Sequence, residues 1–194
     1  FQMNRFTAEE LVRVGMLQPE QLELLRGAVL AHKNILISGA TSTGKTTLVN
    51  ALAGLIEDER LVLIEDTSEL RPAAKNVVRL EAKLVSAREL LRAALRQRPD
   101  RILLGEVRGP EAFDLLQAMN CGHDGMLSTI HASSARKAIV RFADCVLMAG
   151  VEYPHRAILS TISHTLDYVV HLKREGAERK VSEILAVEEL DDVR

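Results

Sequence analysis

The sequence predicts an α/β fold in which a mainly parallel β-sheet is flanked by helices and ends in a C-terminal β-hairpin. Short apolar runs bounded by turn residues alternate with amphipathic stretches at helical spacing along most of the chain. This alternation favours βαβ units with right-handed crossovers, which bind ligands at the carboxyl ends of their strands. At 194 residues, of which 47% are hydrophobic, the chain is long enough for one core and too short for two large domains.

The N-terminal segment, residues 1–33, is predicted to hold a linker and helices. Thr7 and Glu10 form a capping box ahead of a short helix that Gly15 ends. Pro19 then opens a second helix, whose apolar residues recur at helical spacing and place one face against the core.

Residues 34–150 carry the alternating pattern and form the predicted ligand-binding core. The predicted strands are Asn34 to Ser38, Leu61 to Ile64, Val77 to Leu80, Ile102 to Leu104 and Met126 to Ile130. Four helices are predicted in this segment. The first begins at Thr46, and the second begins at Ser86 and is stopped by Pro99. The third runs from Pro110 to Asn120 and the fourth from Ser134 to Met148.

The last segment, residues 151–194, is predicted to add a helix and a hairpin. Pro154 opens the helix. The hairpin pairs Leu166 to Lys173 with Lys180 to Val187 around Glu175-Gly176. The acidic stretch from Glu188 to Asp192 is expected to be a solvated tail.

Composition excludes several classes of function. The 25 basic and 27 acidic residues leave a formal net charge of −2, so no overall field attracts DNA or an anionic membrane. No apolar run approaches the roughly 20 residues that span a bilayer, and the N-terminus does not resemble a signal peptide, so we expect a cytosolic domain. Cys121 and Cys145 lack the spacing of a disulfide framework or a zinc site.

A glycine-containing loop between the first predicted strand and the next helix carries the strongest chemical signal. It reads Gly-Ala-Thr-Ser-Thr-Gly-Lys-Thr and fits the P-loop pattern G-x-x-x-x-G-K-[ST]. Such a loop turns backbone N–H groups toward phosphates, and the helix dipole adds to the anion site. Lys45 is expected to reach the β- and γ-phosphates of a nucleotide, and the Thr46 hydroxyl to bind Mg²⁺. The predicted phosphate-binding residues are Gly39, Ala40, Thr41, Ser42, Thr43, Gly44, Lys45, Thr46 and Thr47.

Carboxylates follow two other predicted strands. Glu65-Asp66-Thr67-Ser68-Glu69 follows the second strand, and Glu106 follows the strand Ile102 to Leu104. A carboxylate at the carboxyl end of a strand can hold a metal-bound water or orient an attacking water. We therefore expect Glu106, and Glu65 with Glu69, to be site residues, and the alternative for each is a solvated loop charge.

His131 ends the fourth buried strand of the pattern. This position places its ring beside the expected γ-phosphate, where it is able to sense or polarise that group. The alternative, a hydrogen-bonded core or surface histidine, stays open on spacing alone.

Several of these segments together resemble a known family. The strings Arg98 to Gly109, Gly122 to Gly125 and Thr129 to Ala132 resemble the Walker B and His boxes of the type II and type IV secretion ATPases, and Ile64 to Glu69 resembles their Asp box. The similarity runs from about Phe6 to Val187. It is closest to the VirB11, TrbB and CpaF branch, which serves conjugation, type IV secretion and Flp-type pilus assembly.

The resemblance implies a RecA-like P-loop NTPase domain that hydrolyses ATP with Mg²⁺. It implies a homohexamer at the cytoplasmic face of the bacterial inner membrane, with ATP bound between subunits and membrane contact only through the secretion or pilus machinery. Direct nucleic-acid binding is not expected, because charge is balanced and only 3% of residues are aromatic.

The family's site residues carry over by position. Lys45 and Thr46 correspond to the phosphate and Mg²⁺ ligands, Glu69 to the water-activating acid, Glu106 to an atypical Walker B carboxylate and His131 to a phosphate sensor. The resemblance implies that Glu65 and Asp66 shape the metal shell. Three arginines, Arg92, Arg96 and Arg108, are candidates for contacts across a subunit interface, and the alternative is a solvated helix face.

Two departures from the family pattern stand out. The loop has Ala40 and Ser42 where the family commonly has glycine, and a Cβ is unfavourable wherever φ must be positive, so nucleotide affinity is expected to be lower. We expect this chain to lack the family's N-terminal domain, with Arg5-Phe6 as its remnant, and so we do not expect the chain alone to form the hexamer.

Three other functions remain as alternatives to an ATP-hydrolysing motor. The altered P-loop is compatible with an assembly module that binds nucleotide without productive hydrolysis. A small-molecule kinase is disfavoured because no arginine-rich lid insertion is evident. A RecA-like nucleic-acid translocase is disfavoured by the charge and the aromatic content.

Overall fold

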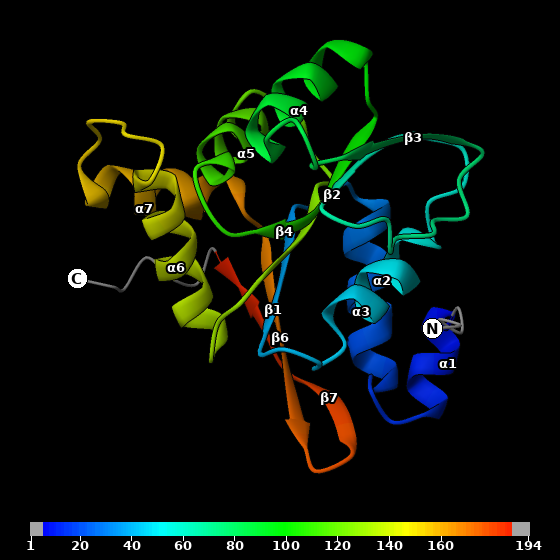
Figure 1. Cartoon of the computed structure of the whole chain (residues 1–194). Coiled ribbons are helices and arrows are strands. Elements are labelled where there is room, and N and C mark those ends of the chain that lie inside the picture. Colours follow the sequence, from blue (N-terminus) through cyan, green and yellow to red (C-terminus); the bar gives the residue numbers. More distant parts are fainter. Residues whose placement is uncertain (1–5, 188–194) are drawn as a thin grey trace.

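In the computed structural model, which describes residues 6–187, the strands form one seven-stranded sheet with helices on both faces (Figure 1). The strand order is β3-β2-β4-β5-β1-β6-β7, and neighbours pair in parallel except for the antiparallel pair of β6 and β7. The strands are β1 (Ile35–Gly39), β2 (Arg60–Glu65), β3 (Asn76–Glu81), β4 (Arg101–Val107), β5 (Leu127–Ile130), β6 (Tyr168–Glu175) and β7 (Glu178–Ala186).

The predicted fold class is confirmed, and each predicted strand is present with slightly different ends. The hairpin has a role that sequence did not predict. Its first strand, β6, pairs in parallel with β1, so it extends the central sheet, and Leu172 lies beside Gly39 in the register. The hairpin therefore packs directly against the end of the P-loop strand.

The helices divide between the two faces of the sheet. α1 (Ala8–Arg13), α2 (Pro19–Leu30) and α3 (Lys45–Ala53) pack with one buried apolar cluster. The opposite cluster holds α4 (Ala87–Ala94), α5 (Glu111–Asn120), α6 (Ala135–Leu147) and α7 (His155–Thr165). Within residues 6–187, no helix is long and apolar enough to cross a membrane.

Predicted helix ends are largely confirmed. Thr7 with Glu10, and Ser86 with Glu89, form complete capping boxes. The helix expected to reach Pro99 instead ends earlier, because α4 tightens into a 3₁₀ turn (Leu95–Gln97) and Arg98 then takes a left-handed conformation. The tail from Glu188 to Asp192, and Arg5, lie outside the described residues.

A buried arginine, Arg101 at the start of β4, connects this strand to α2 and to the residue before β2, at the end of the sheet opposite the P-loop. The Arg101 side chain is 2% exposed, and its guanidinium forms a two-pronged ion pair with Glu59. It also donates to the Val29 carbonyl at 2.7 Å. The hydrogen bond from Arg101 lowers the pKa of the Glu59 carboxyl, so the interaction favours the ionised carboxylate of Glu59.

Replacing this arginine is predicted to destabilise the fold. In Arg101→Met the Glu59 carboxylate loses both guanidinium donors and the Val29 carbonyl loses the Arg101 donor, so the free energy of unfolding should fall by about 2–4 kcal/mol in urea titrations at neutral pH. Because the folded pKa of Glu59 is lowered, its contribution is present above pH 4.5 and is lost as the pH falls further, so the difference from wild type should shrink there.

The exposed Arg96 provides the matched control, since Arg96→Met should stay within about 0.5 kcal/mol of wild type. Equal stability of both variants at neutral pH would contradict the stabilising role of Arg101.

Candidate nucleotide site

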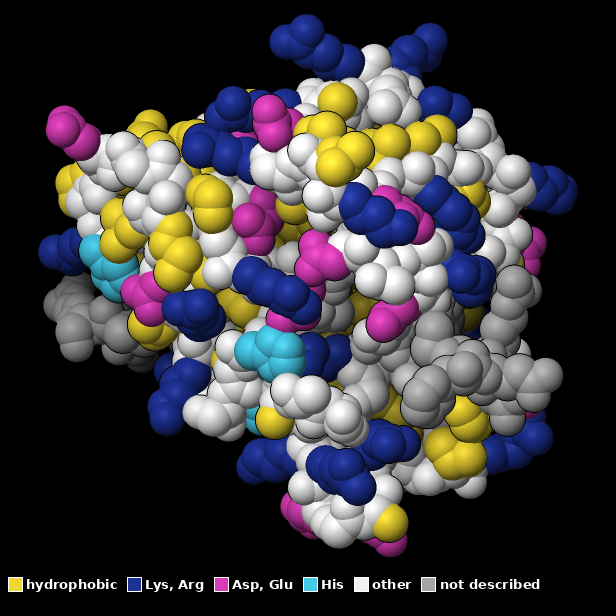
Figure 2. Space-filling view, viewed as in Figure 1, with side chains coloured by type: hydrophobic (Ala, Val, Ile, Leu, Met, Phe, Trp, Pro, Cys, Tyr) yellow, Lys and Arg dark blue, Asp and Glu magenta, His cyan; other side chains and the backbone are white. Residues whose placement is uncertain are grey.

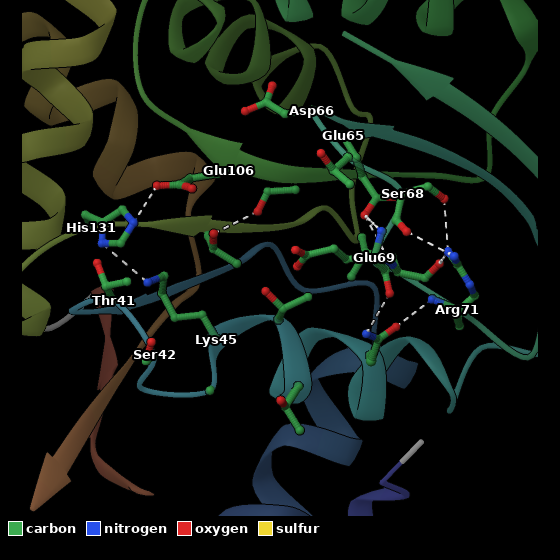
Figure 3. A pocket seen from close by; sticks show the side chains of 18 of the residues that line it. Thr41, Ser42, Lys45, Glu65, Asp66, Ser68, Glu69, Arg71, Glu106 and His131 are labelled. Carbon is green, nitrogen blue, oxygen red and sulfur yellow. Dashed lines mark hydrogen bonds and ion pairs between the residues drawn. The ribbon is translucent and has the colours of Figure 1, made fainter. Parts of the chain in front are cut away.

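The carboxyl ends of β1, β2, β4 and β5 surround a cavity of about 1020 Å³ (Figure 3). Its walls are the P-loop, the acidic loop after β2, the end of β4 and the end of β5. Figure 2 shows acidic and basic side chains gathered with a histidine near the centre of this face. The predicted ligand position, at the carboxyl ends of parallel strands, is therefore where the cavity lies.

Two glycines of the P-loop are required by its geometry. Gly39 has φ +154°, and a Cβ there would lie 2.6 Å from Thr43 Oγ1 and 2.8 Å from the Leu172 carbonyl oxygen. Gly44 has φ +96° and caps α3 in the left-handed region. Both values suit glycine alone, because a side chain would clash at the first position and strain the backbone at the second.

The two residues that replace family glycines differ in their backbone. Ser42 has φ +61°, the left-handed region, so the expected strain is present at this position. Ala40 does not have positive φ, so the condition for strain is not met at that position. A serine carbonyl in this conformation accepts a hydrogen bond from Arg179 Nε at 3.0 Å, which connects the loop to β7.

The predicted phosphate-binding residues separate into two groups. Those that line the cavity are Thr41, Ser42, Gly44, Lys45, Thr46 and Thr47. The other three, Gly39, Ala40 and Thr43, do not line the cavity and instead hold the loop in shape. The buried Thr43 hydroxyl donates to the Ala40 carbonyl at 2.9 Å.

The Lys45 ammonium is held by its own loop. Nζ donates to the carbonyl oxygens of Gly39 and Ala40, each at 3.0 Å, and lies 3.4 Å from Nδ1 of His131. Burial lowers the pKa of Lys45; Glu106 acts against this shift and Arg108 adds to it. A phosphate that enters the loop would replace these carbonyl contacts with stronger charge-assisted ones.

Glu106 is the centre of a chain of polar and charged side chains that line the cavity. Its Oε1 lies 2.8 Å from Nε2 of His131 without receiving an aligned hydrogen bond, and its Oε2 accepts from Arg108 Nη2 at 2.6 Å. Arg108 also pairs with Asp66 at 3.0 Å. The hydrogen bond to Glu106, which outweighs burial, raises the pKa of Arg108, so this guanidinium stays charged. His131 thus lies between Lys45 and Glu106, and its place beside a γ-phosphate stays a prediction.

The acidic loop after β2 is built on Glu65. This carboxylate is buried, and its Oε1 accepts hydrogen bonds from the backbone N–H groups of Glu69 and Leu70 at 2.9 and 2.8 Å. Glu69 is exposed to the cavity, and within residues 6–187 its carboxylate has no hydrogen-bonding or ionic partner. Glu65 thus shapes the loop, and Glu69 is left available for a ligand.

The predicted metal ligands Thr46, Glu65, Asp66 and Glu106 all line the cavity. Two observations fit a cation between them: Arg108 already bridges the Asp66 and Glu106 carboxylates, and the buried Glu106 Oε1 receives no hydrogen bond. Among the described residues, no three acidic, His or Cys side chains form a metal cage by themselves. This donor set suits Mg²⁺, which usually keeps waters and shares its remaining sites with substrate phosphates.

The three candidate interface arginines lie in different surroundings. Arg108 lines the cavity. Arg92 pairs with Asp114 on α5 at 2.6 Å, outside the residues that line the cavity, and Arg96 is exposed after α4. Their roles in contacts between subunits stay predictions.

Sequence reasoning missed several residues that line the cavity, among them Phe6, Asn50, Arg71 and Arg179. Asn50 follows Thr46 by four residues on the same helix and so lies on the same face, which made helical spacing a usable signal for it. Arg179 comes from β7, and no sequence signal pointed to it, because only the pairing of β6 with β1 brings the hairpin to the P-loop.

The fold and this site together define a P-loop nucleotide-binding protein of the α/β class. Residues 1–189 match the model of the family described as "Type II/IV secretion system protein". The chain therefore belongs to the type II/IV secretion system protein family, as its motifs predicted.

Individual relatives agree with this assignment. The chain is 37% identical to the conjugal transfer protein TrbB of Rhizobium radiobacter over 93% of this chain and 56% of that protein. It is 46% identical to the type IV secretion system protein PtlH of Bordetella pertussis over 84% of this chain and 52% of that protein. The crystal structure of the VirB11 ATPase of Brucella suis superposes with a TM-score of 0.84 at 34% identity, covering 97% of this chain and 58% of that one. The chain thus spans about half the length of the curated relatives it matches.

The backbone angles of the P-loop yield a paired prediction. Ser42→Gly should raise the free energy of unfolding by about 0.5–1 kcal/mol, because removing the left-handed strain exceeds the entropy that glycine adds to the unfolded chain. Ala40→Gly should lower it by about 0.4–1 kcal/mol, because only the entropy cost remains. Thermal unfolding of both variants measures the difference, and effects of the same sign would contradict the loop geometry.

Proposed function

We propose that this chain binds ATP with Mg²⁺ and hydrolyses it, as the motor domain of a type IV secretion, conjugative-transfer or pilus-assembly ATPase. The proposal rests on a difference in contacts among the carboxylates that line the cavity. Glu65, Asp66 and Glu106 are engaged by backbone N–H groups, Arg108 or His131, whereas Glu69 faces the cavity without a partner among the described residues. Family membership supports the same reading.

The P-loop is the proposed phosphate site. Its backbone N–H groups and the N-terminus of α3 bind the phosphates, and Lys45 moves from its loop carbonyls to the β- and γ-phosphates. Thr46, with Asp66 and Glu106, would hold Mg²⁺, which when bound neutralises charge that develops on the phosphate oxygens. His131, between Lys45 and Glu106, is placed to sense the γ-phosphate.

Glu69 is the proposed water-activating residue. It orients a water and accepts its proton while the water oxygen forms the new bond to the γ-phosphorus. The bond from that phosphorus to the bridging oxygen breaks, which yields ADP and inorganic phosphate. Lys45 and the loop N–H groups stabilise the charge on the departing oxygens.

We propose that the working form is a homohexamer at the inner face of the bacterial inner membrane, joined to the secretion or pilus machinery through partner proteins. The paired state of Arg108 supports a regulated site, because a nucleotide-bound metal must compete with this guanidinium for Asp66 and Glu106. The alternative of a nucleotide-dependent assembly module shares the phosphate site and differs only in hydrolysis.

Glu69→Gln is predicted to lower kcat for phosphate release by about 10²–10⁴-fold, because the amide cannot accept the water's proton. ATP affinity should stay within about threefold, since Glu69 is not a predicted phosphate ligand. Steady-state phosphate release and fluorescent-nucleotide titration, repeated across protein concentration, measure both quantities.

Lys45→Ala is the control for the phosphate site, and it should abolish both binding and release. Tight Mg·ATP binding with no release at any wild-type concentration would instead identify the assembly module. Unchanged turnover in Glu69→Gln would remove Glu69 from the mechanism.

A further inference from the structure

A side chain of the P-loop helix reaches across the cavity wall to the acidic loop. Asn50 lies on α3, five residues after Lys45, and both polar atoms of its side-chain amide form hydrogen bonds. Its Nδ2 donates to the Glu69 carbonyl oxygen at 3.3 Å, and its Oδ1 accepts from the Arg71 backbone N–H at 2.6 Å. Figure 3 shows Glu69 and Arg71 on this loop, with dashed lines for the contacts.

The same stretch of backbone is fixed from its other side by Glu65. That carboxylate accepts the N–H groups of Glu69 and Leu70, and the Leu70 side chain is buried at 1% exposure. The main chain at Glu69 is therefore bound on its N–H side to the end of β2 and on its carbonyl side to α3. Only the Glu69 side chain remains free to turn toward the cavity.

We infer that Asn50 is a positioning residue for Glu69, tying the water-activating carboxylate to the helix whose first turn carries the phosphate ligands Lys45 and Thr46. This inference rests on the proposed function and deepens it. Because α3 is a continuous helix, one rigid element sets the separation between the phosphate site and the Glu69 backbone. A misplacement of about 1 Å in such a group is able to cost roughly 10²-fold in rate.

Two variants of Asn50 test this role in the full chain. Asn50→Ala removes both contacts, and Asn50→Asp keeps the acceptor for the Arg71 N–H but loses the donor to the Glu69 carbonyl. We expect Asn50→Ala to lower kcat by about 10–100-fold while KM and ATP affinity stay within about threefold. Asn50→Asp should show a kcat between those of Asn50→Ala and wild type.

A double variant separates positioning from general destabilisation. If Asn50 acts through Glu69, adding Asn50→Ala to Glu69→Gln should cause less than a twofold further loss of kcat. Asn76→Ala is the matched control, since it also removes a side-chain hydrogen bond, the one that Asn76 Oδ1 accepts from Arg60, but at a position on β3 outside the cavity. It should leave kcat unchanged.

A readout independent of activity tests the contact itself. Amide hydrogen exchange at Arg71 should accelerate at least tenfold in Asn50→Ala and remain close to wild type in Asn50→Asp. Unchanged kcat in Asn50→Ala, an additive loss in the double variant, or a loss of ATP affinity would each overturn the positioning role. Failure of the proposed function shows differently, as turnover that survives Lys45→Ala or Glu69→Gln.

Discussion

The site depends on one steric constraint, the absence of space for a side chain where β1 turns into the P-loop. A Cβ on Gly39 would overlap Thr43 on one side and the β6 backbone on the other. This close fit exists because β6 pairs in parallel with β1 and so brings Leu172 against the loop. The tight turn then directs the loop carbonyls toward Lys45 and leaves the first turn of α3 facing the cavity. Sheet pairing and phosphate geometry are therefore parts of one arrangement.

Around that turn, the charged groups of the cavity neutralise one another. Lys45 rests on carbonyl oxygens, His131 lies between Lys45 and Glu106, and Arg108 joins Glu106 to Asp66. Such mutual pairing limits the cost of holding several partly buried charges together. Under the proposed function, an incoming nucleotide and metal would exchange with contacts already made, which gives the site a defined resting state. Glu69 stands outside this network and keeps its carboxylate for the ligand.

Much of this arrangement was predictable from sequence because it is encoded in local patterns. The alternation of strands and helices, the capping boxes and the P-loop each follow from residues near one another in the chain. Strand ends also predicted Glu106 and His131 as residues of the ligand site, since parallel strands present their carboxyl ends on one edge. The strain at Ser42 required backbone angles, which a residue type does not specify by itself. Arg179 could not be found, because its approach to the loop depends on which strand pairs with β1.

The central claim is that Glu69 activates the attacking water in a site that hydrolyses ATP. Its most direct test is the chemical identity of the nucleotide that stays bound after incubation with Mg·ATP and rapid separation, determined by chromatography. The account predicts mostly ADP on the wild-type protein and mostly intact ATP on Glu69→Gln. ADP on both, formed at equal rates, would contradict it.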